Sequence, residues 1–98
     1  MVQAFKILEK AQHEFEDAVL WYELKRVGLG SRFAEVVQKK FLQIEQFPER
    51  YPVRKNGFRE TPLKVFPFVI VYKFYKQRKE VVVYNVFNWS RSPSGKYR

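Results

Sequence analysis

The spacing of apolar residues changes about halfway along the 98-residue chain. Up to residue 46 the apolar positions recur every three or four residues, which is the period of an amphipathic helix. Beyond residue 57 they alternate with a period of two, as in a β-strand. The pattern therefore predicts an α+β protein whose helices precede most of its strands.

Two helices are predicted in the first half. The first covers residues 10–27, and the second begins after Ser31, a residue type favoured at helix N-caps, and stops before Pro48. The link over 28–30 contains two glycines and is short, so we expect an antiparallel helical hairpin. The apolar faces are expected to contain Ala11, Phe15, Ala18 and Tyr22 on the first helix, and Phe33, Val37, Phe41 and Ile44 on the second.

Strands are predicted on both sides of this helix pair. A short strand over 2–8 precedes it, and strands over 58–63, 64–75 and 81–88 follow it, the last two joined by the polar turn 76–79. The order β-α-α-β-β-β implies a small antiparallel sheet packed against the helical hairpin, in a single domain over 1–98. The helices should cover one face of the sheet and leave the other open to a partner.

The long strand is apolar on both faces, and so is the strand that follows it. Pro67 cannot donate to a strand ladder, so we expect a bulge or an unpaired position there. The alternation predicts four sets of residues: Phe66, Phe68, Ile70, Tyr72 and Phe74 opposite Val65, Val69 and Val71; and, in the last strand, Val81, Val83 and Phe87 opposite Val82, Tyr84 and Val86.

The excess of positive over negative charge lies in the second half of the chain. Residues 1–50 contain 8 Lys or Arg and 8 Asp or Glu, whereas residues 51–98 contain 11 and 2, which gives the net charge of +9. Clustered in a small fold, these cations would attract phosphate groups or acidic protein surfaces.

The composition also argues against several classes of protein. There is no cysteine and a single histidine, His13, so a disulfide scaffold is excluded and a zinc site within the chain is not expected. No apolar run reaches the ~20 residues needed to cross a bilayer, and the N-terminus lacks the features of a secretory signal. We expect a cytoplasmic protein without metal or cofactor and without membrane partners.

Several local strings bring the sequence close to a known family. They are Ala18-x-x-Trp21-Tyr22, Gly30-x-x-Phe33, Phe47-Pro48, Phe58-Arg59, Phe66-Pro67-Phe68-x-Ile70-x-Tyr72 and Val86-Phe87-Asn88-x-x-Arg91-x-Pro93. In this order and spacing the chain resembles the RelE/ParE superfamily, the toxins of type II toxin–antitoxin modules, and in particular its ParE-like branch. The resemblance implies the same fold that the hydrophobic pattern predicts.

The resemblance implies a toxin and leaves its target open. ParE-like toxins bind and poison DNA gyrase and serve plasmid stabilisation or growth control, and this is our first hypothesis. RelE-like toxins are metal-independent endonucleases that cut mRNA on the ribosome; a degenerate, non-toxic member is the third possibility. In each case the resemblance implies a cognate antitoxin that folds on an apolar groove along the helical hairpin and sheet edge, in a homodimer or a toxin–antitoxin hetero-oligomer.

The candidate functional residues gather near the C-terminus. For target binding we expect the residues Asn88, Trp89, Arg91, Lys96, Tyr97 and Arg98. If the protein is a nuclease, the resemblance implies catalysis by Arg91, Tyr97, Arg59 and Lys64. Against the nuclease, Val69 occupies a position where that branch often carries Arg. Asn88 stands where many relatives carry His, and an amide does not exchange a proton near neutral pH.

Ordinary structural roles remain open for the same residues. Arg59 could pair with Glu60 or a helix carboxylate, and Lys64 could lie in solvent beside a strand. Trp89 is expected to cap the edge of the core rather than contact a partner, and Tyr97 could be disordered so close to the chain end.

Overall fold

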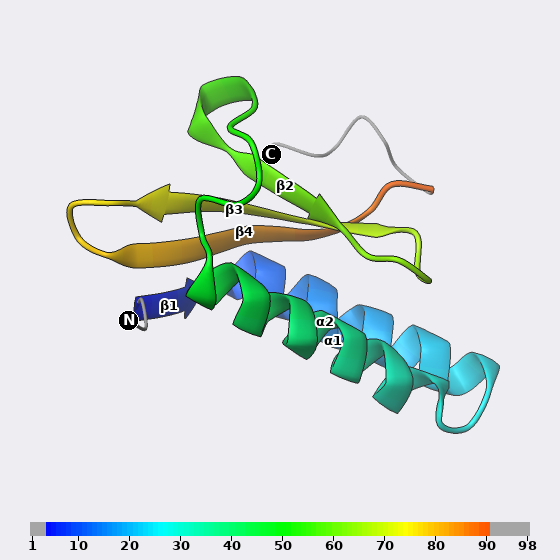
Figure 1. The fold of residues 1–98 in the computed structure, drawn as a ribbon. Helices are drawn as coiled ribbons and strands as arrows, with labels where there is room; N and C mark the ends of the chain where they lie inside the picture. Colours follow the sequence, from blue (N-terminus) through cyan, green and yellow to red (C-terminus); the bar gives the residue numbers. More distant parts are fainter. Residues whose placement is uncertain (1–3, 91–98) are drawn as a thin grey trace.

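The computed structural model describes residues 4–90 and shows two helices beside a twisted sheet (Figure 1). The elements are β1 (Ala4–Ile7), α1 (Glu9–Lys25), α2 (Leu29–Gln46), the short 3-10 helix η1 (Lys55–Gly57), β2 (Arg59–Pro62), β3 (Phe68–Tyr75) and β4 (Glu80–Asn88). The order β-α-α-β-β-β and the α+β class are as predicted.

The sheet has the strand order β1-β4-β3-β2. β2, β3 and β4 pair antiparallel, and β1 adds a parallel strand at the outer edge of β4, with Ala4 opposite Glu80. The two helices run side by side across one face of this sheet (Figure 1). We call the opposite face, on which Val69, Val71 and Phe87 pack together, the open face.

The core lies between the helical hairpin and the sheet. Its helical side comes from the predicted stripes, in which Phe15 and Phe41 are partly buried and the others are buried. Phe33 is fully buried, and its ring lies 4.8 Å from that of Phe68 and 5.1 Å from that of Tyr22. From the sheet the core receives Phe68, Ile70, Tyr72, Val81, Val83 and Val86. Burial of this one continuous set is the main source of stability.

The turn between the helices differs from the prediction. α1 ends at Lys25, and α2 begins at Leu29, so Ser31 lies within the helix and is not its N-cap. The N-cap residue is Gly28, whose φ of 89° favours glycine. The side chain that satisfies the free N–H groups is Glu23 of α1, whose carboxylate accepts hydrogen bonds from Gly28 N at 2.9 Å and Gly30 N at 3.0 Å.

The long strand is shorter than predicted. β3 begins at Phe68, and residues 64–67 form bends in which Val65 is 64% exposed, so Val65 does not occupy a strand face. Of the two alternatives expected at Pro67, a bulge or an unpaired position, the bulge is wrong, because β3 and its paired residues begin at Phe68. The Pro67 carbonyl accepts a hydrogen bond from Trp89 N at 3.1 Å, which continues the pairing with β4 by one residue.

The bulge lies farther along the sheet. Val71 pairs with Asn85 and Tyr72 with Val83, which leaves Tyr84 without a partner on β3. One extra residue reverses the alternation of everything that follows it. This corrects the predicted faces of β4: Val86 joins the core beside the helices, and Phe87 lies on the open face.

Candidate functional site

The predicted target-binding surface begins at the end of β4. The side-chain oxygen of Asn88 accepts hydrogen bonds from Ser90 N at 3.0 Å and Ser90 Oγ at 2.7 Å, which turns the chain at the end of the strand. Trp89 follows and is 52% exposed, so it does not cap the core edge as expected. The half-exposed indole is available to a partner.

The candidate nuclease residues do not come together in the part of the chain that the structure describes. Lys64 is exposed and lies at the same end of the sheet as Asn88, because Asn88 pairs with Phe68 and Leu63 N donates to Phe68 O. Arg59 pairs with Tyr72, roughly 13 Å farther along the strand direction. The other predicted residues, Arg91, Lys96, Tyr97 and Arg98, lie outside the described residues.

Arg59 has a structural partner other than the acids considered above. Its Nη1 donates a hydrogen bond to the carbonyl oxygen of Tyr51 at 2.6 Å and approaches that of Glu49 at 3.5 Å. From the other side, the Tyr72 hydroxyl donates to Pro48 O at 2.7 Å. Burial of Tyr72 raises the pKa of its hydroxyl to about 12. These two side chains hold residues 48–51 against the sheet.

Tyr51 brings a phenol next to cations on this segment. Its hydroxyl lies 3.5 Å from Lys40 Nζ, which also lies 5.7 Å from the centre of its ring. Burial opposes ionisation, but the contact with Thr61 and the nearby Lys40 and Arg50 together lower the pKa of Tyr51 below its ordinary value. No local sequence pattern marks Tyr51 as a functional residue, because its neighbours Lys40 and Thr61 come from α2 and β2.

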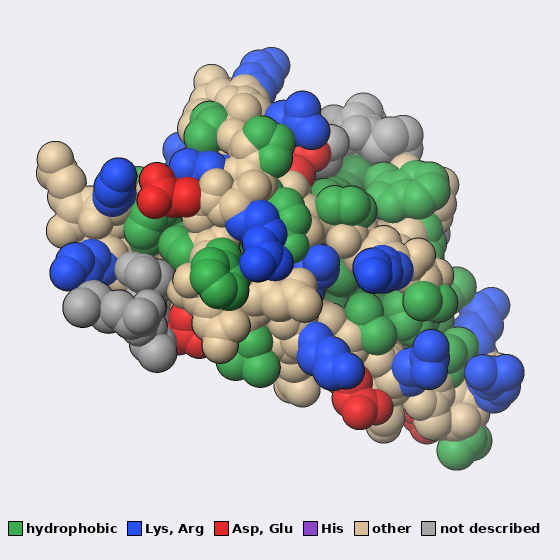
Figure 2. All heavy atoms as spheres, in the orientation of Figure 1, with side chains coloured by type: hydrophobic (Ala, Val, Ile, Leu, Met, Phe, Trp, Pro, Cys, Tyr) green, Lys and Arg blue, Asp and Glu red, His purple; other side chains and the backbone are tan. Residues whose placement is uncertain are grey.

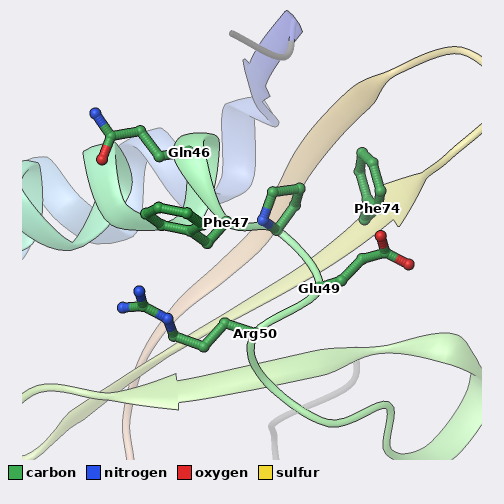
Figure 3. Close-up of a pocket in the computed structure, with 6 residues that line it drawn as sticks. Gln46, Phe47, Glu49, Arg50 and Phe74 are labelled. Carbon is green, nitrogen blue, oxygen red and sulfur yellow. The ribbon is translucent and has the colours of Figure 1, made fainter. Parts of the chain in front are cut away.

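A pocket of about 380 Å³ lies beside this segment (Figure 3). It is lined by Gln46, Phe47, Pro48, Glu49, Arg50 and Phe74. Phe47 is 53% exposed and Arg50 lies over its ring at 4.7 Å, while Glu49 pairs with Lys76 at 3.8 Å. The lining offers an apolar surface with one charge of each sign, which suits a side chain of a protein partner better than a reacting substrate.

An apolar surface also lies where α1 approaches the helical turn. Leu20, Trp21, Leu24 and Val27 are exposed, Leu24 by 78% and Val27 by 90%; we call these four residues the hairpin-turn patch. Leu20 and Leu24 are one helical turn apart and so lie on the same side of α1. Lys25 lies 4.7 Å from the ring of Trp21. Contiguous exposed apolar residues of this kind are typical of a protein interface.

The open face is apolar at its centre. Val69 and Phe87 pair across β3 and β4 and are each 7% exposed, and Val71 is fully buried. The partly buried ring of Phe58 packs against them. Val69, Val71 and Phe87 themselves offer no charge to a phosphate, and the cation described beside this cluster, Lys73, has its Nζ 4.5 Å from the ring of Phe58.

Three other features bear on function: metal-binding clusters, membrane-spanning helices and the distribution of positive charge. Residues 4–90 contain no group of three or more His, Cys, Asp or Glu side chains placed to hold a metal ion. Within the same range no helix has the length and apolar character needed to span a membrane. Lys and Arg side chains are spread over the face seen in Figure 2, the helical part included.

Comparison with known proteins adds two findings. The profile of the family described as "ParE toxin of type II toxin-antitoxin system, parDE" matches residues 5–93. No curated protein sequence matches the chain significantly.

Several solved structures have the same fold. A structure of the chromosomal ParDE system of P. aeruginosa superposes with a TM-score of 0.63 at 16% identity, covering 89% of this chain and 96% of that one. The intact E. coli RelBE toxin–antitoxin complex gives 0.67 at 20% identity, covering 86% and 93%. A free arginine-to-alanine double mutant of E. coli RelE gives 0.70 at 21% identity, covering 95% and 90%. At these identities the likeness shows the fold.

Proposed function

Because the chain belongs to the ParE toxin family of type II toxin–antitoxin systems, we propose that it inhibits DNA gyrase by binding. It is then the toxin of a cytoplasmic module for plasmid stabilisation or growth control. The family profile covers residues 5–93, nearly the whole chain, and supports the toxin assignment. Val69 and Asn88 favour gyrase over ribosome-bound mRNA as the target.

The preference for gyrase rests on two positions of the sheet, Val69 on the open face and Asn88 at the end of β4. Cleavage of a phosphodiester needs cationic donors where negative charge develops and a group that transfers protons. Val69, at the position where the RNase branch often carries Arg, is 7% exposed and lies against Phe87. The Asn88 oxygen already accepts two hydrogen bonds from Ser90. Both observations favour a toxin that binds its target over one that cuts RNA.

The proposed gyrase-binding surface is the sheet end at which β4 stops. The described part contributes the half-exposed Trp89 and the exposed Lys64. The sequence continues with Arg91, Lys96, Tyr97 and Arg98. An aromatic anchor among cations fits an acidic surface on a large partner.

The proposed antitoxin site is the hairpin-turn patch. Apolar residues one turn apart on α1 match a mode in which an amphipathic segment packs its apolar face against a helical surface. Lys25 and Arg26 lie beside the patch and are exposed, so acidic residues on the antitoxin would complement them. Covering these apolar side chains would also favour a hetero-oligomer over the free toxin.

The decisive experiment measures the two targets separately. Purified gyrase is incubated with plasmid DNA and the toxin, and linear DNA is quantified after protein denaturation. Wild type should produce linear DNA, and Trp89→Ala should reduce it roughly tenfold, as expected for an interface aromatic worth ~1–2 kcal/mol. His13→Ala, an exposed change on α1, is the matched control and should have no effect.

Primer extension on ribosome-bound mRNA is the second measurement. The proposal predicts intact mRNA under conditions in which cells stop growing. Cuts within codons, with gyrase unaffected, would establish the nuclease instead. Normal growth on induction, with neither effect, would identify a degenerate member of the family.

A further inference from the structure

The β3–β4 hairpin carries cations and aromatic rings in mutual contact on the open face, far from the end of β4. Lys73 Nζ lies 4.5 Å from the ring centre of Phe58 and 5.7 Å from that of Tyr84. Arg78 lies 4.2 Å from the ring of Tyr75, whose hydroxyl is 2.7 Å from that of Tyr84. We call these five residues, Phe58, Lys73, Tyr75, Arg78 and Tyr84, the hairpin-end surface.

The bulge in β4 creates this arrangement. Tyr84 is the extra residue, because no residue of β3 pairs with it in the strand ladder. Bulges commonly change the direction in which a side chain points. Here Tyr84 meets Phe58 edge-on, with ring centres 5.0 Å apart, and shares its hydrogen bond with Tyr75. Phe58, Tyr75 and Tyr84 are all partly exposed.

The surrounding charge is positive on balance, with four Lys or Arg near the carboxylates of Glu49 and Glu80. Residues 73–79 contain four Lys or Arg and no acid. Lys76 pairs with Glu49 at 3.8 Å and Arg78 with Glu80 at 2.7 Å, both cations being largely exposed. Exposed ion pairs of this kind are worth only ~0–1 kcal/mol, so a stronger anion can replace their acids. No described carboxylate lies within ion-pairing distance of Lys73.

The tyrosine pair adds no negative charge to this surface. The hydrogen bond with Tyr75, together with partial burial, raises the pKa of Tyr84 to about 12. Tyr84 is therefore neutral at physiological pH, and because the two hydroxyls share one hydrogen bond, one of them remains able to donate to an anion.

We propose that the hairpin-end surface binds single-stranded nucleic acid, with Lys73 and Arg78 contacting phosphates and the rings of Phe58, Tyr75 and Tyr84 stacking on bases. Sites that bind single strands recurrently combine Lys or Arg along the path of the nucleic-acid backbone with aromatic rings on which any base can stack. An acidic peptide would use the cations and gain little from three grouped rings. Residues two apart on a strand are ~7 Å apart, so the surface accommodates a few nucleotides. The inference does not depend on gyrase being the target.

The test is the fluorescence anisotropy of a fluorescein-labelled 15-nucleotide oligothymidylate titrated with the full-length protein. The logarithm of affinity should fall with the logarithm of salt concentration with a slope of about −1.4, as expected for the two phosphates neutralised by Lys73 and Arg78 on a single strand. Lys73→Glu should weaken binding about tenfold and reduce that slope by about 0.7. Tyr84→Ala should also weaken binding about tenfold through lost stacking.

Lys39→Glu is the matched control, because it makes the same charge change at an exposed position on α2, across the sheet from the proposed site. It should change affinity less than threefold. Equal losses for Lys39→Glu and Lys73→Glu would overturn the proposal, since net charge alone would then explain binding. Polyglutamate competing as well as the oligonucleotide, per charge, would also overturn it in favour of an acidic protein surface.

Circular dichroism of each variant shows whether it folds, and Lys73→Gln replaces the charge reversal if the latter disturbs the sheet. Tyr84→Phe keeps the ring and removes its hydroxyl, so it should retain binding. Because gyrase is absent from the measurement, a negative gyrase assay and a negative binding assay refer to different proposals.

Discussion

Single residues determine how closely the two helices approach each other. A methyl group added to Gly30 would lie 2.5 Å from the backbone oxygen of Val19 and 2.9 Å from Cβ of Glu23. The same Glu23 caps α2 by accepting hydrogen bonds from Gly28 N and Gly30 N. The space for this cap exists because position 30 has no side chain.

Gly30→Ala should therefore destabilise the protein, although alanine has the higher helix propensity by ~1 kcal/mol. The backbone oxygen cannot move aside without separating the helices, so we expect a net loss of ~1–3 kcal/mol in the free energy of unfolding. Urea denaturation measures it. Ser31→Ala, exposed on the next position, should stay within ~0.5 kcal/mol, and a similarly small change for Gly30→Ala would contradict the close approach.

Tyr72→Phe should remove the hydrogen bond to Pro48 O and leave that carbonyl without its buried donor. We expect a loss of ~1–3 kcal/mol near neutral pH. Urea denaturation of the two proteins side by side gives the difference. An unchanged midpoint would show that the 48–51 segment does not need this contact.

Tyr72 also predicts how stability depends on pH. Its pKa is about 12 in the folded protein and 10.0, the ordinary value of an exposed tyrosine, on unfolding. Between these values the unfolded state loses the proton first, so the free energy of unfolding falls as pH rises through this window and is unaffected below it. The fall should be smaller in Tyr72→Phe, in unfolding curves at pH 9 and pH 11; equal falls would exclude this contribution.

The predictions for single residues were correct for side chains that are buried in the core. They were less successful for side chains that form hydrogen bonds with a backbone group. The helix stripes with Phe33 and Ile44 are buried as expected, because hydrophobic periodicity reports burial directly. Arg59 was considered as a partner of Glu60 or a helix carboxylate, and in the structure it donates a hydrogen bond to Tyr51 O. Every residue has a carbonyl, so no sequence pattern marks the one that an arginine will contact.

At the scale of elements, a side chain of α1 completes the edge of β4. β1 pairs with β4 only as far as Val83. Beyond that point the Glu14 carboxylate accepts a hydrogen bond from Val86 N at 2.9 Å and lies 3.3 Å from Asn85 Nδ2. The Glu14 carboxylate thus accepts the hydrogen bond that a neighbouring strand would otherwise accept from Val86 N.

Glu14→Ala should expose this backbone group and loosen α1 from β4. We expect a loss of ~1–3 kcal/mol, together with faster hydrogen exchange at the Val86 amide than at Val81. Glu16→Ala is the control, because Glu16 is exposed on the same helix and bonds only Gln12 among the contacts described. Unchanged protection of Val86 would show that the helix contact is dispensable.

The order and type of the elements could be predicted, but not which residues of β4 face the helices and which lie on the open face. Residues 81–87 are apolar at both odd and even positions, so the same string fits either face of a sheet. The bulge at Tyr84 selects the phase, and it depends on packing against β3 and the helices. The helix start was misplaced for a related reason, since the carboxylate that caps α2 belongs to α1.

For the whole molecule, the C-terminal segment is predicted to carry toxicity and not folding. Deleting residues 92–98 removes Lys96, Tyr97 and Arg98 but no residue of the described core. The truncated protein should keep its circular dichroism spectrum and its antitoxin, measured by co-purification, while growth inhibition on induction is lost. Full toxicity of the truncated protein would rule out this placement.

The candidate site was only partly predictable from the sequence. Trp89 and Lys64 were selected as candidates separately, without any expected spatial relation, and in the structure both are exposed at the end of the sheet where β4 stops. The hairpin-end surface was missed because Phe58, Lys73 and Tyr84 come from separate segments. The spacing of Lys73 and Tyr75, two apart on one strand, was the one local signal, and it predicts a shared face without predicting what joins them there.

The parallel pairing of β1 with β4 has a consequence for synthesis of the protein. Ala4 and Glu80 are partners, so the first strand must wait until a residue 76 positions later has been made. At ~5–20 residues per second the ribosome needs several seconds for that stretch, and the exit tunnel delays the last strand further. The nascent chain therefore cannot complete its sheet while it is being translated, and the cell has a short interval in which an antitoxin can engage the chain before the finished protein reaches its target.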